Sequence, residues 1–455
     1  MSVVSEEGNG LKVIVGLGVT GLSCARYLSA KGDRFKVVDS RQNPPALAEF
    51  RKLYPSVQYE LGGFNQETFT TAQELIVSPG ISLKTPEIEA ARKRNVRITG
   101  DIDIFSKTVT SPVVAVTGSN GKSTVVELLA EILDTAGVNV GVGGNLDSER
   151  AKPALDLLLE EPREIYLLEL SSFQLETTES LGAEVATILN LSADHLDRYE
   201  GLEDYLSAKQ RIFRGCKKVV LNRDDPYSKP PEDIQVPTLD FGFGRPGSNG
   251  FGLLEEGDDQ YLAFQFEKIV SAHELKIFGL HNIANVLAAS ALAKALDIDM
   301  AAIRKGIQSF TGLPHRCQWV ANISGVDFYN DSKGTNVGAT LAAVEGLGQR
   351  IAGHILLIAG GVGKGADFRS LVPVINRWGK EVILIGRDAV EIAAHFDSDI
   401  QTYFAEDMQD AVKVSLEHAA PGDAVLLSPA CASFDMYDNY RHRGQSFIES
   451  VERLQ

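Results

Sequence analysis

The sequence has few cysteines, no leader pattern and no long apolar run. Its four cysteines among 455 residues lie far apart and form no CxxC pair: Cys24, Cys216, Cys317 and Cys431. This argues against a disulfide scaffold and against a structural zinc site. The first ten residues, MSVVSEEGNG, show neither the basic nor the apolar region of a secretory signal. No apolar run approaches the roughly 18 residues of a membrane span, so we expect a soluble, cytoplasmic protein.

The chain also lacks an excess of positive charge. It has 44 Lys and Arg against 61 Asp and Glu, a formal net charge of −17. A protein that coats nucleic acid or an anionic membrane presents a basic face, so we expect neither partner. Hydrophobic residues make up 44% of the chain and charged residues 23%, which is typical of globular domains. At roughly 150 residues per domain, the length indicates about three domains.

Short apolar strands alternate with helices along the chain, a pattern typical of parallel sheets flanked by helices. We predict an α/β fold with a Rossmann-like N-terminal domain (1–104), a P-loop mononucleotide-binding central domain (105–311) and a Rossmann-like C-terminal domain (312–455). A hairpin is expected at 261–269 and a helix at 284–296. Strands are expected at 12–16, 35–39, 74–78, 113–117, 165–170, 185–190, 217–222, 326–330, 354–360, 381–386 and 423–428.

The clearest local signal is TGSNGKST at residues 117–124, between an expected strand and an expected helix. Glycines let backbone N–H groups point into one concavity and the helix start adds partial positive charge, so the segment suits phosphate groups. Its GxxGKS spacing is two residues shorter than the usual P-loop. We predict a nucleoside triphosphate site with Lys122 on a terminal phosphate and Ser123 or Thr124 on Mg²⁺. The remaining loop contacts are assigned to Gly118, Ser119, Asn120 and Gly121.

A second glycine motif, GLGVTG at residues 16–21, follows the first strand, and Asp39 stands 18 residues after its last glycine. This spacing is near that of a nicotinamide dinucleotide site. The same turn holds the diphosphate of any nucleotide-like ligand, so we favour a diphosphate-containing substrate; NAD binding and a purely structural turn stay open. A third run, GGVGKG at residues 360–365, has no hydroxyl after Lys364 and suits an anionic co-substrate better than a second ATP.

Several further segments carry a joint signal along nearly the whole chain. They are ELSSFQLE at 169–176, NLSADHLDRY at 190–199, AK at 208–209, HNIAN at 281–285, GLPHR at 312–316, DSKGTN at 331–336 and LSPACASFD at 427–435. Together with TGSNGKST, they resemble the Mur ligase and folylpolyglutamate synthase superfamily. ELSSFQLE and SPACAS particularly resemble the D-glutamate-adding branch of the Mur ligases.

The resemblance implies an ATP-dependent amide ligase of peptidoglycan precursor synthesis. In this family ATP phosphorylates the substrate carboxylate, and the resulting acyl phosphate is attacked by the amine of the incoming amino acid. The implied substrates are UDP-N-acetylmuramoyl-L-alanine and D-glutamate, the implied cofactors are ATP and two Mg²⁺ ions, and we expect a monomer.

The catalytic residues implied are Lys122, Glu169, His195, Lys209 and Arg316. Glu169 also fits from its position alone, because it ends an apolar strand (IYLLE) beside the expected phosphate loop, where a carboxylate can share Mg²⁺ with Ser123. The resemblance adds His195 and Lys209 as metal-site residues, with Lys209 carbamylated by CO₂. The alternatives are a surface or core histidine for His195 and a plain phosphate-binding or surface lysine for Lys209.

The remaining site residues follow the family pattern. Around ATP, Arg316 would brace the phosphates as a bidentate guanidinium, while Asp331 would bind the ribose and Lys333 would lie near the transferred phosphate. Asn282 and Asn285 would contact adenine or phosphate, unless they only cap a helix. The UDP substrate is assigned to Leu17, Thr20, Gly21, Asp39, Ser40, Arg41, Ser78, Pro79, Gly80, Asn145 and His195. D-Glutamate is assigned to Thr335, Lys364, Ser433 and Tyr440, where Tyr440 replaces the more common Phe.

Other functions stay open at this point. A diaminopimelate-adding ligase would carry Asp-Asn-Pro-Arg in the third domain, and the sequence has no such segment. A folylpolyglutamate synthase would not be expected to show GxGxxG on a complete N-terminal α/β domain. From other classes, an NAD-dependent oxidoreductase and a regulatory ATP-binding module without chemistry also fit single motifs.

Overall fold

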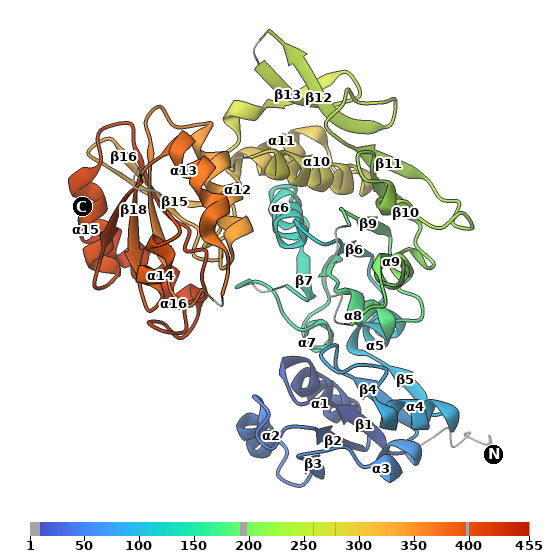
Figure 1. Ribbon diagram of the computed structural model, residues 1–455. Coiled ribbons are helices and arrows are strands. Elements are labelled where there is room, and N and C mark those ends of the chain that lie inside the picture. The colour runs from blue at the N-terminus through green and yellow to red at the C-terminus, as the bar shows by residue number, and fades with distance from the viewer. Residues whose placement is uncertain are drawn as a thin grey trace, which may run out of the picture. The chain divides into compact units, whose positions relative to one another are not determined.

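The computed structural model describes residues 10–146, 148–191, 198–257, 259–277, 279–363, 365–396 and 400–454. The chain forms two compact units (Figure 1). Unit 1 comprises Met1–His273 and Ala284–Ile307, and unit 2 comprises Glu274–Ile283 and Gln308–Gln455. The predicted α/β fold class is confirmed, since parallel or mainly parallel sheets with helices on their faces make up both units.

The first sheet of unit 1 has the strand order β3-β2-β1-β4-β5, and its strands are parallel. The order turns back between β1 and β4, and open α/β sheets bind ligands at such switch points. Val13, Ile14 and Val15 are fully buried because helices cover both faces. The elements are β1 (Lys12–Val15), α1 (Val19–Lys31), β2 (Phe35–Asp39), α2 (Leu47–Leu53), β3 (Tyr59–Leu61), α3 (Gln66–Thr70), β4 (Glu74–Val77), α4 (Pro86–Lys93), β5 (Arg97–Thr99) and α5 (Asp101–Thr108).

The second sheet of unit 1 runs β14-β13-β12-β11-β10-β9-β6-β8-β7. It is parallel from β7 to β12 and antiparallel from β12 to β14. Strand β6 lies between β8 and β9, so the carboxyl ends of all three meet at one edge. The strands are β6 (Val113–Thr117), β7 (Val140–Gly144), β8 (Ile165–Glu169), β9 (Val185–Ile188), β10 (Lys218–Asn222), β11 (Thr238–Phe241), β12 (Gly250–Glu256), β13 (Asp259–Phe264) and β14 (Glu267–Ser271).

The helices of the second sheet include the one that follows the phosphate loop. They are α6 (Lys122–Thr135), α7 (Ala154–Leu157), α8 (Ser172–Glu176), α9 (Leu202–Gln210), α10 (Leu280–Ala295) and α11 (Met300–Ser309). Helix α6 turns Val125, Leu128 and Leu129 toward the core at helical spacing, and each is fully buried. This packing fixes the start of α6 at the sheet edge.

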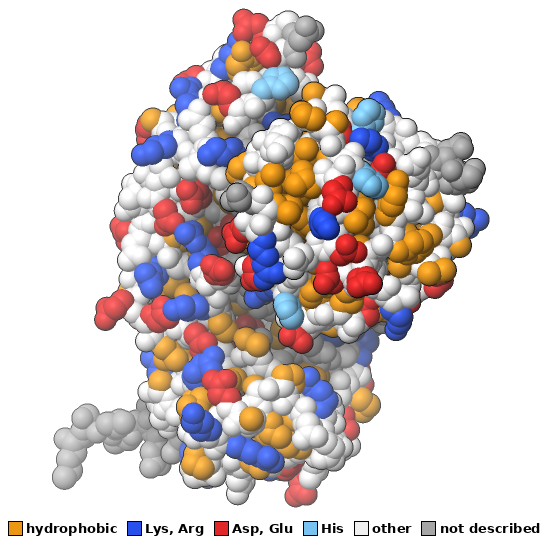
Figure 2. Space-filling view, turned by 90° about the vertical axis from the view of Figure 1, so that its left-hand side faces the viewer, with side chains coloured by type: hydrophobic (Ala, Val, Ile, Leu, Met, Phe, Trp, Pro, Cys, Tyr) orange, Lys and Arg blue, Asp and Glu red, His pale blue; other side chains and the backbone are white. Residues whose placement is uncertain are grey.

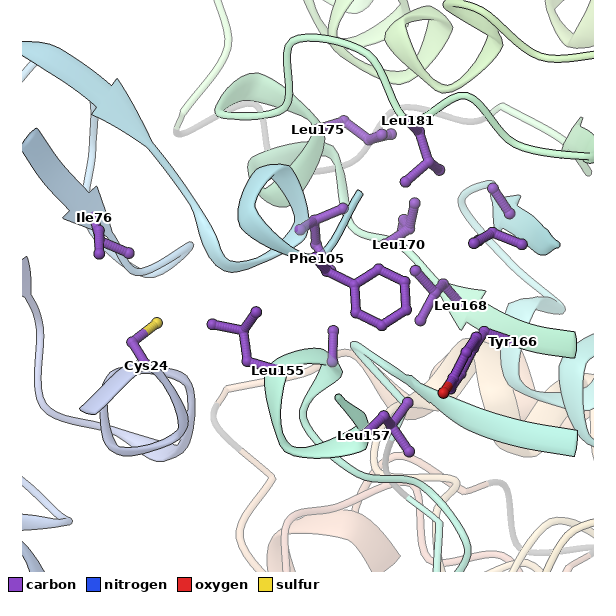
Figure 3. Close-up of a cluster of buried hydrophobic side chains, with 14 of the residues drawn as sticks. Cys24, Ile76, Phe105, Leu155, Leu157, Tyr166, Leu168, Leu170, Leu175 and Leu181 are labelled. Atoms are coloured by element: carbon purple, nitrogen blue, oxygen red, sulfur yellow. The ribbon is translucent and has the colours of Figure 1, made fainter. Parts of the chain in front are cut away.

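A shared apolar core joins the two sheets of unit 1 (Figure 3). Cys24 of α1 and Leu155 of α7 belong to it, as do Phe105 of α5 and Tyr166 of β8. The rings of Phe105 and Tyr166 pack edge to face with centroids 5.5 Å apart. A salt bridge at the margin adds to the contact, since Arg26 donates to Asp156 at 2.5 Å. Burial of this apolar surface is the main reason that the two sheets form one unit.

Unit 2 is built on the sheet β15-β16-β20-β17-β18-β19, in which only the pairing of β15 with β16 is antiparallel among the strands described. Apolar clusters cover its two faces. The elements are β15 (Gln318–Ile323), β16 (Val326–Asn330), α12 (Val337–Gly348), β17 (Ile355–Gly360), α13 (Val372–Trp378), β18 (Gly379–Ile385), α14 (Ala389–Ala393), β19 (Gln401–Phe404), α15 (Met408–His418), β20 (Ala424–Leu427) and α16 (Tyr440–Glu452).

The strands expected from the sequence are present, with ends that differ by one or two residues. The expected hairpin at 261–269 is the pair β13–β14, which continues onto β12. The expected helix at 284–296 begins four residues earlier, at Leu280, because the Asn-containing segment HNIAN lies inside its first turns.

Charges of both signs are interspersed on the face of the molecule shown in Figure 2. The net charge of −17 is therefore not gathered into one acidic field on that face. Within the ranges described above, no helix is both long and apolar enough to cross a bilayer.

Candidate active site

The phosphate loop connects β6 to α6 in unit 1 (Figure 1). Gly121 has φ +82°, and a Cβ there would lie 2.3 Å from Asn285 Oδ1, so a side chain at this position does not fit. Lys122 folds back over the loop and donates to the carbonyls of Gly118 at 3.0 Å and Ser119 at 3.1 Å. The loop thus places a lysine ammonium beside a run of backbone amides at a helix N-terminus, which is an anion-binding arrangement.

Ser123 and Glu169 meet beside this loop. Ser123 Oγ, in the first turn of α6, donates to Glu169 Oε2 at 2.7 Å. Glu169 ends β8 and is only 3% exposed, and its backbone carbonyl accepts from Asn145 N at 2.7 Å. A hydroxyl and a carboxylate side by side are hard oxygen ligands of the kind Mg²⁺ prefers.

Lys209 approaches the same loop from α9. Its side chain is buried, at 2% exposure, and Nζ donates to Gly118 O at 2.9 Å and to Thr117 Oγ1 at 3.2 Å. Nζ also lies 4.7 Å from the centre of the Tyr205 ring. A helix-face lysine is normally solvated, so its burial against the phosphate loop sets Lys209 apart.

Four more sequence candidates belong to the loop or to the first turns of α6 and α10. Asn120 N donates to Asn190 Oδ1 at 2.8 Å, which ties the loop to the end of β9. Thr124 lies in the first turn of α6. Asn285 is 7% exposed next to Gly121, while Asn282 N donates to Gly279 O at 2.9 Å in the first turn of α10.

Two predicted site residues lie outside the described residues, His195 and Lys364. Among the residues that are described, no group of three or more His, Cys, Asp and Glu side chains forms a ready metal site. Ser123 and Glu169 supply two described oxygen donors for a cation at the loop.

The first glycine turn lies at the switch point between β1 and β4. A Cβ on Gly21 would stand 1.9 Å from Gly16 O, so α1 can start here only with glycine. Leu17 N donates to Asp39 Oδ2 at 2.7 Å. Arg41 forms a two-pronged contact with the same carboxylate, Nε to Oδ1 at 2.9 Å and Nη2 to Oδ2 at 2.7 Å. Asp39 is therefore engaged by protein donors on both oxygens.

The charge state of Asp39 follows from these contacts. The carboxylate is fully buried, which acts to raise its pKa. Hydrogen bonds from Arg41 and from Leu17 N outweigh burial, so the pKa of Asp39 lies below its ordinary value. The turn thus carries a permanent anion that holds Arg41 in one orientation.

The other candidates for the UDP substrate lie around this turn. Ser78, directly after β4, donates from Oγ to Gly16 O at 3.2 Å, which joins the loops after the two central strands. Pro79 and Gly80 continue that loop. Thr20 is in the first turn of α1, and Ser40 is exposed beyond β2. Asn145 is exposed at the end of β7 in the second sheet, within the same unit.

In unit 2, Asp331 follows β16 and is 7% exposed. Ser428 Oγ donates to its Oδ2 at 2.7 Å and Cys317 N to its Oδ1 at 3.2 Å. Burial raises the pKa of Asp331 to about 7, against the lowering effect of these hydrogen bonds and of the Arg316 charge. Asp331 thus differs from Asp39 in having no arginine on its oxygens, while Arg316 itself is exposed.

Two of the candidates in unit 2, Lys333 and Tyr440, contact each other. Lys333 Nζ lies 3.9 Å from the centre of the Tyr440 ring, a cation–π distance. The Tyr440 hydroxyl accepts from Arg441 Nε at 3.3 Å, and the assignment of Tyr440 to D-glutamate stays a prediction. Thr335 N donates to Lys333 O at 2.8 Å, and the buried Ser433 accepts from Tyr437 N at 2.8 Å.

The sequence interpretation missed Arg443. This arginine of α16 is 1% exposed. It donates to Ser332 Oγ at 3.0 Å, Ser332 O at 2.9 Å and Cys431 O at 3.1 Å, and so ties the segment of Lys333 to the segment of Ser433. The available signal was helical spacing, since Arg443 shares a face with the fully buried Phe447.

Family models match the chain in three successive segments. The model of the Mur ligase MurD-like N-terminal domain matches residues 11–100. The Mur ligase middle domain matches residues 116–293, and the Mur ligase glutamate ligase domain matches residues 315–431. The resemblance inferred from the sequence motifs is thereby confirmed.

The chain also has close full-length relatives. It is 49% identical over 454 residues to the UDP-N-acetylmuramoylalanine--D-glutamate ligase of Pseudomonas aeruginosa, with 100% of each chain covered. It is 46% identical over 454 residues to the ligase of the same name from Hahella chejuensis, again with 100% of each covered. Among solved structures, UDP-N-acetylmuramate-alanine ligase MurC of Thermotoga maritima matches with a TM-score of 0.59 and 19% identity, covering 98% of this chain and 100% of that chain. At that identity the likeness shows the fold alone.

Proposed function

The chain belongs to the Mur ligase family, and from this premise we propose that it is the ATP-dependent ligase that joins D-glutamate to UDP-N-acetylmuramoyl-L-alanine. The observation that carries the proposal is 49% identity over the full length of a ligase whose name states this reaction. The product is a peptidoglycan precursor. The proposal includes action as a monomer in the cytoplasm.

The proposed reaction has two steps. The L-alanyl carboxylate of the UDP substrate takes the terminal phosphoryl group of ATP and becomes an acyl phosphate, and ADP leaves. The amine of D-glutamate then attacks the acyl carbon, and phosphate leaves as the amide forms. Most of the catalytic effect in such a reaction is stabilisation of charge on the transferred group.

The phosphate loop is the proposed site of the ATP phosphates. The backbone amides of Gly118–Thr124 surround them, and Lys122 moves from the carbonyls of Gly118 and Ser119 to a terminal phosphate oxygen. Ser123 and Glu169, 2.7 Å apart, fit Mg²⁺ as a hydroxyl and a carboxylate ligand. When bound, Mg²⁺ neutralises charge on the transferred phosphoryl group.

Lys209 is proposed to be carbamylated, as a ligand of a second Mg²⁺ together with His195. The reaction joins the neutral amine to CO₂ and releases a proton, so it requires an ammonium that loses its charge. Lys209 is 2% exposed and its Nζ contacts Gly118 O and Thr117 Oγ1, so the amine is held out of bulk solvent beside the phosphate loop. Intact mass spectrometry before and after brief acid treatment tests this, together with activity in CO₂-free buffer. Equal mass and equal activity in both conditions would rule out the carbamate.

The remaining roles follow the family positions. Arg316 braces the ATP phosphates, Asp331 binds the ribose and Lys333 lies near the transferred phosphate. Asn282 and Asn285 contact the nucleotide. D-Glutamate is recognised by Thr335, Lys364, Ser433 and Tyr440. Each of the three ligands is assigned to one proposed domain: the UDP substrate to 1–104, ATP to 105–311 and the amino acid to 312–455.

The UDP substrate is assigned to the first glycine turn. The amides of Leu17, Thr20 and Gly21 receive its diphosphate, and Arg41 faces its phosphate or uracil. Ser40, Ser78, Pro79 and Gly80 shape the remainder of the site, and Asn145 and His195 meet the sugar-peptide end. Asp39 acts here by positioning, because Leu17 N and Arg41 occupy its oxygens. An Asp engaged in this way is not available to bind the ribose of NAD, which argues against a dehydrogenase.

One assay tests the activity and the amino-acid choice. The protein is incubated with ATP, Mg²⁺ and UDP-N-acetylmuramoyl-L-alanine, and D-glutamate, L-glutamate, glycine or diaminopimelate is added singly. Phosphate release is expected with D-glutamate and is expected to stop when EDTA removes the metal. Release only with another amino acid, or NADH turnover without phosphate release, would overturn the proposal.

A further inference from the structure

A cationic cavity lies in unit 1, and none of its lining residues belongs to the phosphate loop or to the first glycine turn, although Arg198 donates to Gly80 O at 3.4 Å. Its volume is about 380 Å³, and it is bounded by the segment after β4, by α4, by α8 and by α9 with the segments directly before and after it. The charged lining is dominated by Lys84, Arg92, Arg198, Arg211 and Arg214. None of these residues is part of the site proposed above.

Positive charge is in clear excess in this cavity. Five cationic side chains line it against two carboxylates, Glu176 and Asp204. Lys84 pairs with Glu200 at 3.0 Å, whereas within the described part of the chain none of the four arginines forms an ion pair with a carboxylate. In a chain with a net charge of −17, a cavity in which cations outnumber carboxylates by five to two is unusual.

The arginines are held in place by neutral partners. Arg211 donates to Leu175 O and to Thr178 O, both at 2.7 Å. Arg198 lies 4.3 Å from the centre of the Phe173 ring. A guanidinium has five N–H donors, so two contacts to carbonyls leave Arg211 with donors to spare. Burial and the neighbouring Arg214 lower the pKa of Arg211, and the more weakly acting charges of Glu176 and Asp103 do not offset them.

A buried hydroxyl provides a second, independent observation. Tyr199 lines the cavity and is 7% exposed. Its Oη makes no hydrogen bond of normal length and angle to a described residue, although, besides burial, the nearby Glu176 and Ser172 side chains influence its pKa. Its ring is fixed between Phe173, with parallel planes and centroids 5.8 Å apart, and Tyr205 at 5.2 Å. A buried hydroxyl without a partner is unfavourable, so it marks a place where a ligand oxygen would complete the structure.

We propose that this cavity binds a compact polyanion of the phosphate class, with the four arginines as charge partners and Tyr199 Oη as a hydrogen-bond donor. Several guanidinium groups with free N–H donors suit tetrahedral oxyanions that carry more than one charge. The ligand is either inorganic diphosphate or the phosphate groups of a phosphorylated metabolite, and the cavity has room for a small organic part. This proposal does not depend on the proposed ligase function, because its test measures ligand binding and not enzymatic activity.

The test is calorimetric titration of the full chain carrying Lys122→Ala, which weakens binding at the phosphate loop. Inorganic pyrophosphate and fructose 1,6-bisphosphate are the two probes, and the tighter one identifies the source of the phosphate. Arg92→Gln together with Arg214→Gln is expected to weaken binding by about tenfold or more, since two charges are lost. Both residues are exposed, so the fold should tolerate the change.

Arg34→Gln together with Arg94→Gln is the matched control, because these exposed arginines of unit 1 do not line the cavity. Binding of this control should equal that of the parent. Absence of binding of both probes to the parent, or equal weakening in the two double variants, would overturn the proposal.

Tyr199→Phe separates ligand binding from a structural role. Because Oη makes no hydrogen bond of normal length and angle in the described fold, its removal should leave the melting temperature unchanged or raised and weaken probe binding by about threefold to tenfold. Unchanged binding together with a lowered melting temperature would show that the hydroxyl serves the fold and would overturn its assignment to the ligand.

Discussion

The two glycine turns of unit 1 share a scaffold and differ in chemistry. Each joins a buried parallel strand to a helix, β1 to α1 and β6 to α6. In the first turn, the close approach is between backbone atoms, Gly21 against Gly16 O. In the phosphate loop, the close approach is between Gly121 and a side chain, Asn285 Oδ1. The first turn is thus constrained for shape, whereas the second is packed against polar side chains.

The charged groups at the two turns also differ in their partners. At the first turn, the carboxylate of Asp39 is paired with Arg41 and with Leu17 N, so positive and negative charge cancel locally. At the phosphate loop, Lys122 rests on backbone carbonyls, and Glu169 accepts from a neutral hydroxyl. The first arrangement suits binding of a ligand that does not react, and the second can respond to charge that develops during a reaction.

The largest effect is expected from Lys122→Ala at the phosphate loop. Loss of the ammonium removes stabilisation of transferred charge, so kcat for phosphate release should fall by about 10²- to 10³-fold or more, while the melting temperature changes little. Steady-state kinetics measure kcat, and calorimetry measures the melting temperature. Lys52→Ala, on an exposed lysine of α2, is the control and should behave as the parent. A kcat within a few-fold of the parent would remove Lys122 from the proposed site.

The second effect concerns the shape of the first turn. Gly21→Ala would place Cβ 1.9 Å from Gly16 O, and backbone atoms cannot yield as a flexible side chain does, so the melting temperature should fall by about 10 °C or more. Gly18→Ala is the matched control, because Gly18 has φ −103° and nothing lies within 4 Å of the added Cβ. Equal loss of stability in both variants would contradict this account of the turn.

The third effect separates binding from chemistry. Asp39→Asn removes the charge that holds Arg41 and the Leu17 amide. We expect KM for the UDP substrate to rise by about tenfold while kcat changes by less than about threefold. The initial-rate dependence on this substrate at saturating ATP and D-glutamate measures both constants. A fall in kcat without a change in KM would mean that Asp39 acts in the chemical step.

The sequence predicted those features of the two turns that depend on neighbouring residues. Strand, glycine turn and helix follow one another within about 20 residues, and Ser123 with Glu169 could be paired because both sit at carboxyl ends of adjacent parallel strands or just beyond them. Contacts that depend on side-chain geometry could not be predicted. The contact of Arg41 with Asp39 is one of them, and the assignment of Arg41 to the UDP substrate stays a prediction.

Two further features were not predicted, for different reasons: the short edge strands of the first sheet and the apolar core that the two sheets of unit 1 share. Strands β3 and β5 have three residues each, too few to show an apolar period. The common core depends on which helices meet, as Phe105 and Tyr166 do, and one sequence carries no direct signal for contacts so far apart along the chain.

The smallest effect is the pH dependence that Asp39 gives to stability. Its pKa is lower in the folded chain than the ordinary value near 4, so the charged form favours folding at pH values above about 4, and this contribution is lost as pH falls through the folded-state pKa. The melting temperature of the parent minus that of Asp39→Asn should therefore be constant between pH 7 and about pH 5 and shrink below about pH 4. Asp233→Asn, on an exposed aspartate, is the control and should show no such change. A difference that stays constant down to pH 3 would mean that the Arg41 pair does not hold Asp39 ionised, and the contrast between the two turns would then rest on shape alone.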